Sequence, residues 1–199
     1  FVKNFDKVSY AADLKAKTEF EAHPNYRLFP QDIAKLEFLP ESDLIVTFAA
    51  ESHVDNAITS NRRFVETNVL GTQNLLELVR QKHVNERPLF IHISTDEVYG
   101  DISKGRHSEG DMLIPSNPYS ATKAAADMLV VSWGRTYKLP WCIVRPTNNY
   151  GEHQYPEKLI PVAVRKALED EIQALMNGKK KADQAVKDAQ KKADEIMRP

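Results

Sequence analysis

A hydroxyl and two adjacent carboxylates follow an apolar run near the middle of this 199-residue chain. The run is 89–93, and Thr95, Asp96 and Glu97 come just after it. A buried parallel strand delivers polar groups in this way to the carboxyl end of a sheet, where open α/β folds bind their ligands. Elimination of water requires a base and an acid, and two carboxylates can divide these roles if their surroundings separate their pKa values.

A tyrosine and a lysine stand some twenty residues further on, in a stretch typical of a helix. Tyr119 and Lys123 are four residues apart, so they share one helix face. An ammonium beside a phenol favours the phenolate and lowers the pKa of the phenol. We therefore predict that Tyr119 takes a proton from a substrate hydroxyl near neutral pH.

Apolar periodicity predicts the elements that hold these groups. Strands are expected at 44–50, 89–93 and 141–144, and helices at 64–82 and 119–137. Weaker patterns indicate a helix at 13–21 and a strand at 26–29. Alternation of strands and helices predicts an α/β fold in which helices cover both faces of a parallel sheet.

The chain changes character from about residue 163. We expect a first domain at 1–167 and a helical tail at 168–199 that takes no part in catalysis, because its carboxylates are interleaved with lysines. The tail should form a helical hairpin with a stop at Asn177 and Gly178. The expected apolar stripe of the first helix is Val164, Leu168, Ile172, Leu175 and Met176. The expected seam of the second is Ala182, Val186, Ala189, Ala193 and Ile196.

Composition excludes several classes of function. The net charge is −1, which predicts no attraction to nucleic acid. The chain shows no apolar run of membrane-spanning length and no signal peptide, so we expect a cytoplasmic protein. Cys142 lies in an apolar run and is expected to be a buried thiol. We find no metal-ligand spacing among the histidines, the cysteine and the carboxylates.

Five segments together resemble one enzyme family over about residues 1–167. They are 5–11, 49–55, 94–101, 118–123 and 148–161. The chain resembles the nucleotide-sugar 4,6-dehydratases of the extended short-chain dehydrogenase/reductase superfamily, with the dTDP-glucose 4,6-dehydratases nearest. The resemblance implies an incomplete Rossmann-like sheet, NAD as cofactor, a nucleotide-sugar substrate and a homodimer.

The resemblance also implies a role for each chemical group. The reaction oxidises C4 of the sugar, eliminates water across C5 and C6, and returns the hydride at C6. Tyr119 would be the base for the C4 hydroxyl, with Lys123 lowering its pKa and contacting the nicotinamide ribose. Thr95 would bind the C4 oxygen, Glu97 would remove the C5 proton, and Asp96 would protonate the leaving hydroxyl.

Further positions are assigned to binding on the same basis. Cofactor contacts are implied at Asp6, Asp32, Ile33, Ala49, Ala50 and Asn148, together with Tyr119 and Lys123. Asp6 would accept the adenosine ribose hydroxyls, which favours NAD over NADP. Substrate contacts are implied at Ser52, Asn149 and Glu157.

The sequence also departs from the family pattern. It opens where the family's second strand would end, and its seven glycines do not form the family's phosphate-binding loop. We therefore expect the 199-residue polypeptide alone to bind NAD poorly and to be inactive.

Residues of the tail resemble the last helices of sugar-transporter solute-binding proteins. A 4-epimerase or decarboxylase, a sugar-binding protein and a hybrid remain alternatives, and the nucleotide base is open.

Overall fold

The computed structural model describes residues 1–9, 14–53, 57–58, 60–151, 155 and 158–197. Contacts divide the chain into two compact units, Phe1–Asn148 and Asn149–Pro199. The first unit holds every strand among the described residues, and the second is helical. Each unit is described separately below.

All strand pairs of the first unit are parallel. β1 (Val2–Phe5) pairs with β2 (Tyr26–Phe29) in a two-stranded sheet. β4 (Leu89–Ile93) lies between β3 (Leu44–Thr47) and β5 (Trp141–Val144) in a three-stranded sheet. Parallel neighbours require crossover connections, which helices provide here. The predicted α/β, Rossmann-like class is confirmed.

The helices of the first unit connect these strands. They are α1 (Leu14–Glu21), α3 (Arg62–Phe64), the π-helix η2 (Val65–Gly71), α4 (Thr72–Gln81) and α5 (Pro118–Tyr137). Short 3₁₀ helices are η1 (Ile33–Lys35), η3 (Val84–Glu86) and η4 (Asp96–Tyr99). The helix expected at 64–82 is therefore present, with a π-helical first half.

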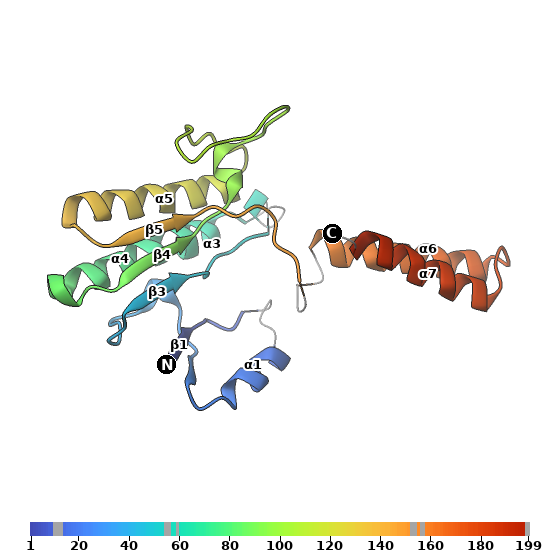
Figure 1. Cartoon of the computed structure of the whole chain (residues 1–199), viewed down its shortest axis with the longest axis horizontal. Coiled ribbons are helices and arrows are strands. Elements are labelled where there is room, and N and C mark those ends of the chain that lie inside the picture. The colour runs from blue at the N-terminus through green and yellow to red at the C-terminus, as the bar shows by residue number, and fades with distance from the viewer. Residues whose placement is uncertain (10–13, 54–56, 59, 152–154, 156–157, 198–199) are drawn as a thin grey trace. The chain divides into compact units, whose positions relative to one another are not determined.

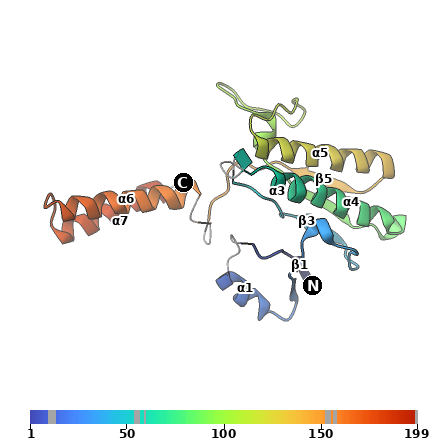
Figure 2. The same cartoon turned by 180° about the vertical axis from the view of Figure 1, so that it is seen from behind.

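The core of this unit lies between the three-stranded sheet and helices α4 and α5. Leu76 and Val79 of α4, Phe90 of β4 and Val130 of α5 are fully buried there. In Figure 2 the two helices lie in front of the strands, and in Figure 1 the strands lie in front. Side chains such as Leu89 on β4 are 40% exposed, so among the described residues one face of this sheet is covered where we expected two.

The prediction of a buried thiol at Cys142 is wrong. Cys142 is exposed, and so are its neighbour Trp141 and the nearby Val144. All three lie on β5, which is one of the two edge strands of the three-stranded sheet. An apolar run predicts a buried strand, but it does not say which strand of the sheet has a neighbour on both sides.

Gly100 ends the turn after β4 and has a backbone that side chains rarely adopt. Its φ is +87°, and an added Cβ would collide with the carbonyl oxygen of Ile114. Gly105 has the same φ of +87° with nothing within 4 Å of its Cβ position. Comparing alanine substitutions at the two glycines therefore distinguishes the cost of backbone strain from the cost of a collision.

We expect Gly100→Ala to destabilise the protein more than Gly105→Ala. The control substitution costs only the positive-φ strain, about 1–2 kcal/mol. Gly100→Ala adds a collision with backbone, which costs about a further 1–3 kcal/mol. Urea unfolding of both variants measures the difference, and equal free energies of unfolding would contradict the collision.

The second unit is an antiparallel hairpin of α6 (Leu159–Met176) and α7 (Ala182–Met197). The predicted hairpin is present, but the predicted seam and stripe are partly wrong. Ala185 and Ala189 are buried in α7, whereas Val186 is 69% exposed. Leu168, Ile172, Leu175 and Met176 of α6 are exposed as well. Small residues allow the two helices to approach closely, so the larger side chains turn outward.

A buried carboxylate takes the place of large apolar side chains between these helices. Glu171 of α6 is 3% exposed. Its carboxylate accepts hydrogen bonds from Lys180 and Lys192, each at 2.6 Å. Lys180 also donates to Asp188 of α7 at 2.6 Å. This ion network joins the turn and both helices of the hairpin.

The hairpin is expected to lose stability in acid. The hydrogen bonds from Lys180 and Lys192 hold the pKa of Glu171 below its ordinary value. A carboxyl group with a depressed pKa in the folded state contributes stability above its unfolded pKa and loses it as pH falls through the folded pKa. Amide chemical shifts of α7 should therefore change at acid pH, below the ordinary glutamate range.

Glu171→Gln should remove most of this acid transition and weaken the hairpin already at neutral pH. The matched control is Glu169→Gln on the same helix, whose ion pair with Arg165 is exposed. Exposed pairs of this kind contribute little. A transition that is unchanged in Glu171→Gln would contradict the role of the network.

Candidate functional site

The predicted hydroxyl and carboxylates lie on a short turn at the carboxyl end of the central strand. η4 follows β4, and Thr95 caps it by accepting a hydrogen bond from the amide of Glu97 at 3.3 Å. The Thr95 hydroxyl donates to Asp96 Oδ1, also at 3.3 Å. Thr95 is buried, and both carboxylates are half-buried. The turn therefore presents two carboxylates beside a fixed hydroxyl.

Asn117 connects this turn to the start of α5. Its amide nitrogen donates to Glu97 Oε2 at 3.2 Å. The Asn117 side-chain oxygen accepts a hydrogen bond from the backbone N–H of Ser120 at 2.9 Å. In return, the Ser120 hydroxyl accepts a hydrogen bond from the backbone N–H of Asn117 at 3.2 Å. This reciprocal capping box fixes the helix that carries Tyr119. Sequence reasoning missed Asn117, although an Asn-Pro pair before a helix is a known start signal.

Tyr119 lies within electrostatic reach of the turn. Burial raises the pKa of Tyr119 to about 12, and the negative charges of Glu97 and Asp96 act in the same direction. A hydrogen bond with Thr95 opposes them. Of the five groups that we predicted to converge, Thr95, Asp96, Glu97 and Tyr119 are thus brought together by η4, its cap and α5. The fifth group is Lys123.

Lys123, the residue expected to activate Tyr119, bonds to the backbone of the central strand. The Lys123 ammonium donates to the carbonyl oxygen of Ile93 at 2.7 Å. Burial lowers the pKa of Lys123 to about 8. Burial of Tyr119 and the charges of Glu97 and Asp96 disfavour its phenolate.

The residues assigned to the adenosine half of a cofactor lie at strand ends of the first unit. Asp6 follows β1, is exposed, and accepts from the amide of Val8 at 2.6 Å. Asp32 caps η1 through the amide of Ala34 at 2.9 Å. Ile33 is buried against Gly71, where an added Cβ would reach its side chain.

The remaining assigned residues lie on two loops. Ala49 and Ala50 are half-buried just after β3, and Ser52 is exposed on the same loop. Asn148 is exposed at the end of the first unit, and Asn149 begins the second. Glu157 lies outside the residues that the structure describes.

Asn68 is a further residue that sequence reasoning missed. This buried side chain of η2 accepts from the amide of Glu51 at 2.9 Å and donates to the carbonyl of Glu51 at 3.0 Å. It also donates to the hydroxyl of Thr122 on α5 at 2.9 Å. Asn68 therefore ties the loop after β3 to the Tyr119 helix. An amide in the middle of an amphipathic helix was the available signal.

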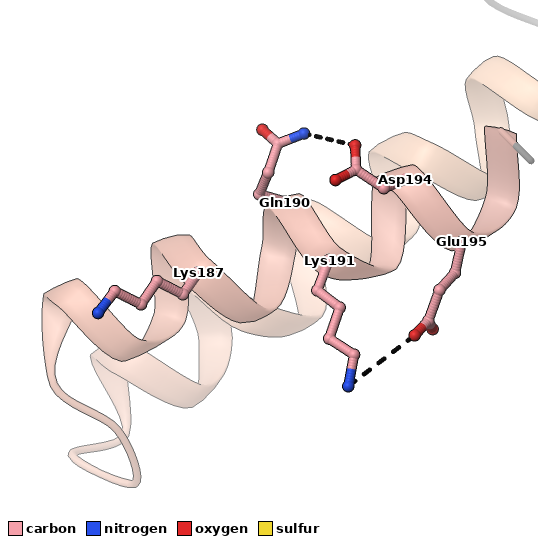
Figure 3. Close-up of a pocket in the computed structure, with 5 residues that line it drawn as sticks. All are labelled: Lys187, Gln190, Lys191, Asp194 and Glu195. Carbon is pink, nitrogen blue, oxygen red and sulfur yellow. Dashed lines mark hydrogen bonds and ion pairs between the residues drawn. The ribbon is translucent and has the colours of Figure 1, made fainter.

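The second unit offers a hollow on α7 that we do not interpret as a site. Figure 3 shows five polar side chains along this helix. Gln190 donates to Asp194 at 2.7 Å, and Lys191 pairs with Glu195 at 3.9 Å. Such pairs one turn apart are typical of a solvated helix face.

Two absences can be stated for the part of the chain that the structure describes. Its histidine, cysteine and carboxylate side chains form no group of three that could hold a metal ion. Within the same residues, none of the helices has both the length and the apolar character needed to span a bilayer.

Comparison with known proteins gives the family. The model of the family described as GDP-mannose 4,6 dehydratase matches residues 2–198. The chain belongs to the GDP-mannose 4,6 dehydratase family. This confirms the resemblance to nucleotide-sugar 4,6-dehydratases that five motifs predicted. The match also extends through α6 and α7.

Individual relatives place the chain within this family. It is 45% identical over 174 residues to the low-salt glycan biosynthesis protein Agl12 of Haloferax volcanii, covering 85% of this chain and 55% of that protein. It is 44% identical over 181 residues to dTDP-glucose 4,6-dehydratase of Neisseria gonorrhoeae, covering 84% of this chain and 52% of that enzyme.

A solved structure supports the same placement. DesIV, a dTDP-glucose 4,6-dehydratase from Streptomyces venezuelae solved with NAD and TYD bound, has a TM-score of 0.76 and 40% identity. The match covers 85% of this chain and 53% of DesIV. The chain thus spans about half the length of the relatives it matches.

Proposed function

We propose that the full-length gene product carrying this chain dehydrates a nucleotide-activated hexose, such as dTDP-glucose, to its 4-keto-6-deoxy form. The adjacent Asp96 and Glu97 carry the proposal, because they lie on the turn after the central strand and act on Tyr119 electrostatically. Elimination of water needs both a base and an acid. Epimerisation at C4 needs no such pair.

Each residue has one task in the proposed reaction. Tyr119 removes the C4 hydroxyl proton, and the Thr95 hydroxyl holds the C4 oxygen. Glu97, held by Asn117 at 3.2 Å, removes the C5 proton, which is acidic beside the new ketone. Asp96 then protonates the C6 hydroxyl as it leaves. Glu97 then returns its proton to C5, and Tyr119 releases its proton to solvent because the product keeps the C4 ketone.

The residues present fit NAD in their donor chemistry. An exposed carboxylate at the end of β1, that of Asp6, suits ribose hydroxyls. The small residues Ala49 and Ala50 at the end of β3 permit close approach of a ring or a phosphate. When bound, NAD supplies the hydride acceptor and a positive ring charge that favours the Tyr119 phenolate. Asp32, Ile33, Asn148 and Lys123 complete the proposed cofactor contacts.

The same proposal assigns the substrate contacts, the cellular location and the oligomeric state. Ser52, Asn149 and Glu157 are proposed to contact the sugar nucleotide, and the protein is proposed to be a cytoplasmic homodimer. The relatives include a dTDP-glucose 4,6-dehydratase and a second such enzyme solved with TYD bound. They favour a deoxythymidine nucleotide here.

A substrate panel tests the proposal. The full-length gene product is incubated with NAD and, separately, with dTDP-glucose, UDP-glucose or GDP-mannose. Mass spectrometry should detect loss of one water from one of these sugars, and dTDP-glucose is expected to react fastest. Conversion without loss of water would favour an epimerase, and no conversion of any of the three would contradict the proposal.

A further inference from the structure

A buried ion pair lies one helical turn behind Lys123. Asp127 follows Lys123 by four residues on α5, and its side chain is 0% exposed. Arg145, just after β5, donates from Nε to Asp127 Oδ2 at 2.8 Å. Arg145 also donates to the hydroxyl of Tyr99 at 2.6 Å. None of these side chains has a task in the proposed reaction.

His92 of β4 completes the surroundings of this carboxylate. Its Nε2 lies 3.6 Å from Asp127 Oδ1, and its Nδ1 is hydrogen-bonded to the Thr47 hydroxyl at 2.9 Å. Burial lowers the pKa of His92 to about 3, and the charge of Lys123 acts in the same direction. The ring is therefore neutral at neutral pH and does not compete with Lys123 as a cation for Asp127.

The groups that face Lys123 come from three directions. On α5 itself the charged neighbour is Asp127, one turn onward. From β4 come the neutral His92 ring and the Ile93 carbonyl, which accepts the ammonium at 2.7 Å. From η4 the carboxylates of Asp96 and Glu97 act on Tyr119, one turn before Lys123. Arg145 contacts Asp127 rather than Lys123.

We infer that Asp127 is a positioning residue that acts through Lys123. Its carboxylate, held by Arg145, keeps the buried Lys123 ammonium charged and bonded to Ile93. The catalytic consequence rests on the proposed function, because it requires the Tyr119–Lys123 pair to be in use. The electrostatic part stands independently of that function.

The signs of the charge effects agree with this inference. Burial lowers the pKa of Lys123, and Asp127 is the charge that opposes the fall. Burial raises the pKa of Asp127 itself, while the hydrogen bond and the charge of Arg145 lower it again. A charge-assisted bond of 2.8 Å to a guanidinium favours the ionised carboxylate. Removal of Asp127 should thus move the pKa of Lys123 further below 8.

A lysine titration tests the inference without any substrate. Protein labelled with ¹³C in lysine is titrated by NMR, and the Lys123 ε-methylene signal is assigned by its loss in Lys123→Arg. In Asp127→Asn the titration midpoint should fall by about one pH unit or more, an effect typical of losing a nearby opposite charge. Asp127→Glu should largely restore the midpoint.

Two further variants keep the result interpretable. Asp111→Asn changes an exposed carboxylate on the loop after η4 and should leave the midpoint unchanged. Should Asp127→Asn not fold, Asp127→Asn combined with Arg145→Met leaves no unpaired buried charge. Its midpoint is compared with that of Arg145→Met alone, so that the lost guanidinium charge is common to both proteins. An unchanged Lys123 midpoint in the folded variant would overturn the inference and reduce Asp127 to a packing residue.

The pH profile of turnover tests the catalytic consequence of the inference. If Lys123 loses its proton at lower pH, the basic limb of activity in Asp127→Asn should move to lower pH by a similar amount. A shifted lysine midpoint in a protein that converts no sugar would support the electrostatic inference while contradicting the proposed function. If the wild type forms product but the Lys123 midpoint is the same in the wild type and in Asp127→Asn, the inference is contradicted and the proposed function is not.

Discussion

Tyr119→Phe should lower turnover of the full-length gene product by about two to four orders of magnitude, the usual cost of losing a general base. The substitution removes one oxygen atom and leaves the ring, which packs edge-on against Phe64 with centroids 6.4 Å apart. Nucleotide-sugar affinity should therefore stay within a few fold of wild type. Steady-state kinetics and calorimetry measure the two quantities separately.

Tyr137→Phe is the matched control. Tyr137 is the last residue of the same helix and is 40% exposed, so loss of its hydroxyl should leave turnover unchanged. Turnover near the wild-type level in Tyr119→Phe would remove the phenol from the mechanism. A parallel loss of affinity and turnover would show that Tyr119 binds the substrate and does not act as the base.

Glu97→Gln should separate oxidation of the sugar from elimination of water. The amide keeps the size of the carboxylate and can still meet Asn117, but it cannot accept the C5 proton. Release of the 4-keto-6-deoxy product should fall by about two to four orders of magnitude. Oxidation at C4 should continue, so the absorbance of reduced nicotinamide should rise and persist.

Glu109→Gln controls for loss of a carboxylate near the site. Glu109 is exposed on the loop between η4 and α5, and its side chain has no task in the proposed reaction. This variant should release product at the wild-type rate without persistent reduced nicotinamide. Product release at full rate from Glu97→Gln would show that another group removes the C5 proton.

The fold was largely predictable because its strands are short apolar runs with clear ends. The runs at 44–47 and 89–93 became neighbouring parallel strands, and the cap at Asn117 starts the predicted helix. The exposure of Cys142 was not predictable, because it depends on the position of β5 at the sheet edge. The seam of α7 shifted because the buried Glu171 network admits only small residues such as Ala185 and Ala189.

The residues that form the candidate site were easier to predict from the sequence than the pKa values of those residues. Spacing placed Tyr119 and Lys123 on one helix face, and the strand ending at residue 93 placed Thr95 beside them. The pKa of Tyr119 moved opposite to the expectation, since burial and Glu97 depend on distant parts of the chain. Asn68 and Asp127 were missed because each is a single polar residue within a helical pattern.

We propose that Asp96 and Glu97 give the full-length gene product its dehydratase activity. The most direct test is turnover of dTDP-glucose with NAD in deuterated water, followed by NMR of the sugar product. The account predicts a 4-keto-6-deoxy sugar that carries deuterium at C5, because a carboxylate that has exchanged with solvent removes and replaces that proton. A C4 epimer that retains its C6 hydroxyl and its C5 proton would contradict the account.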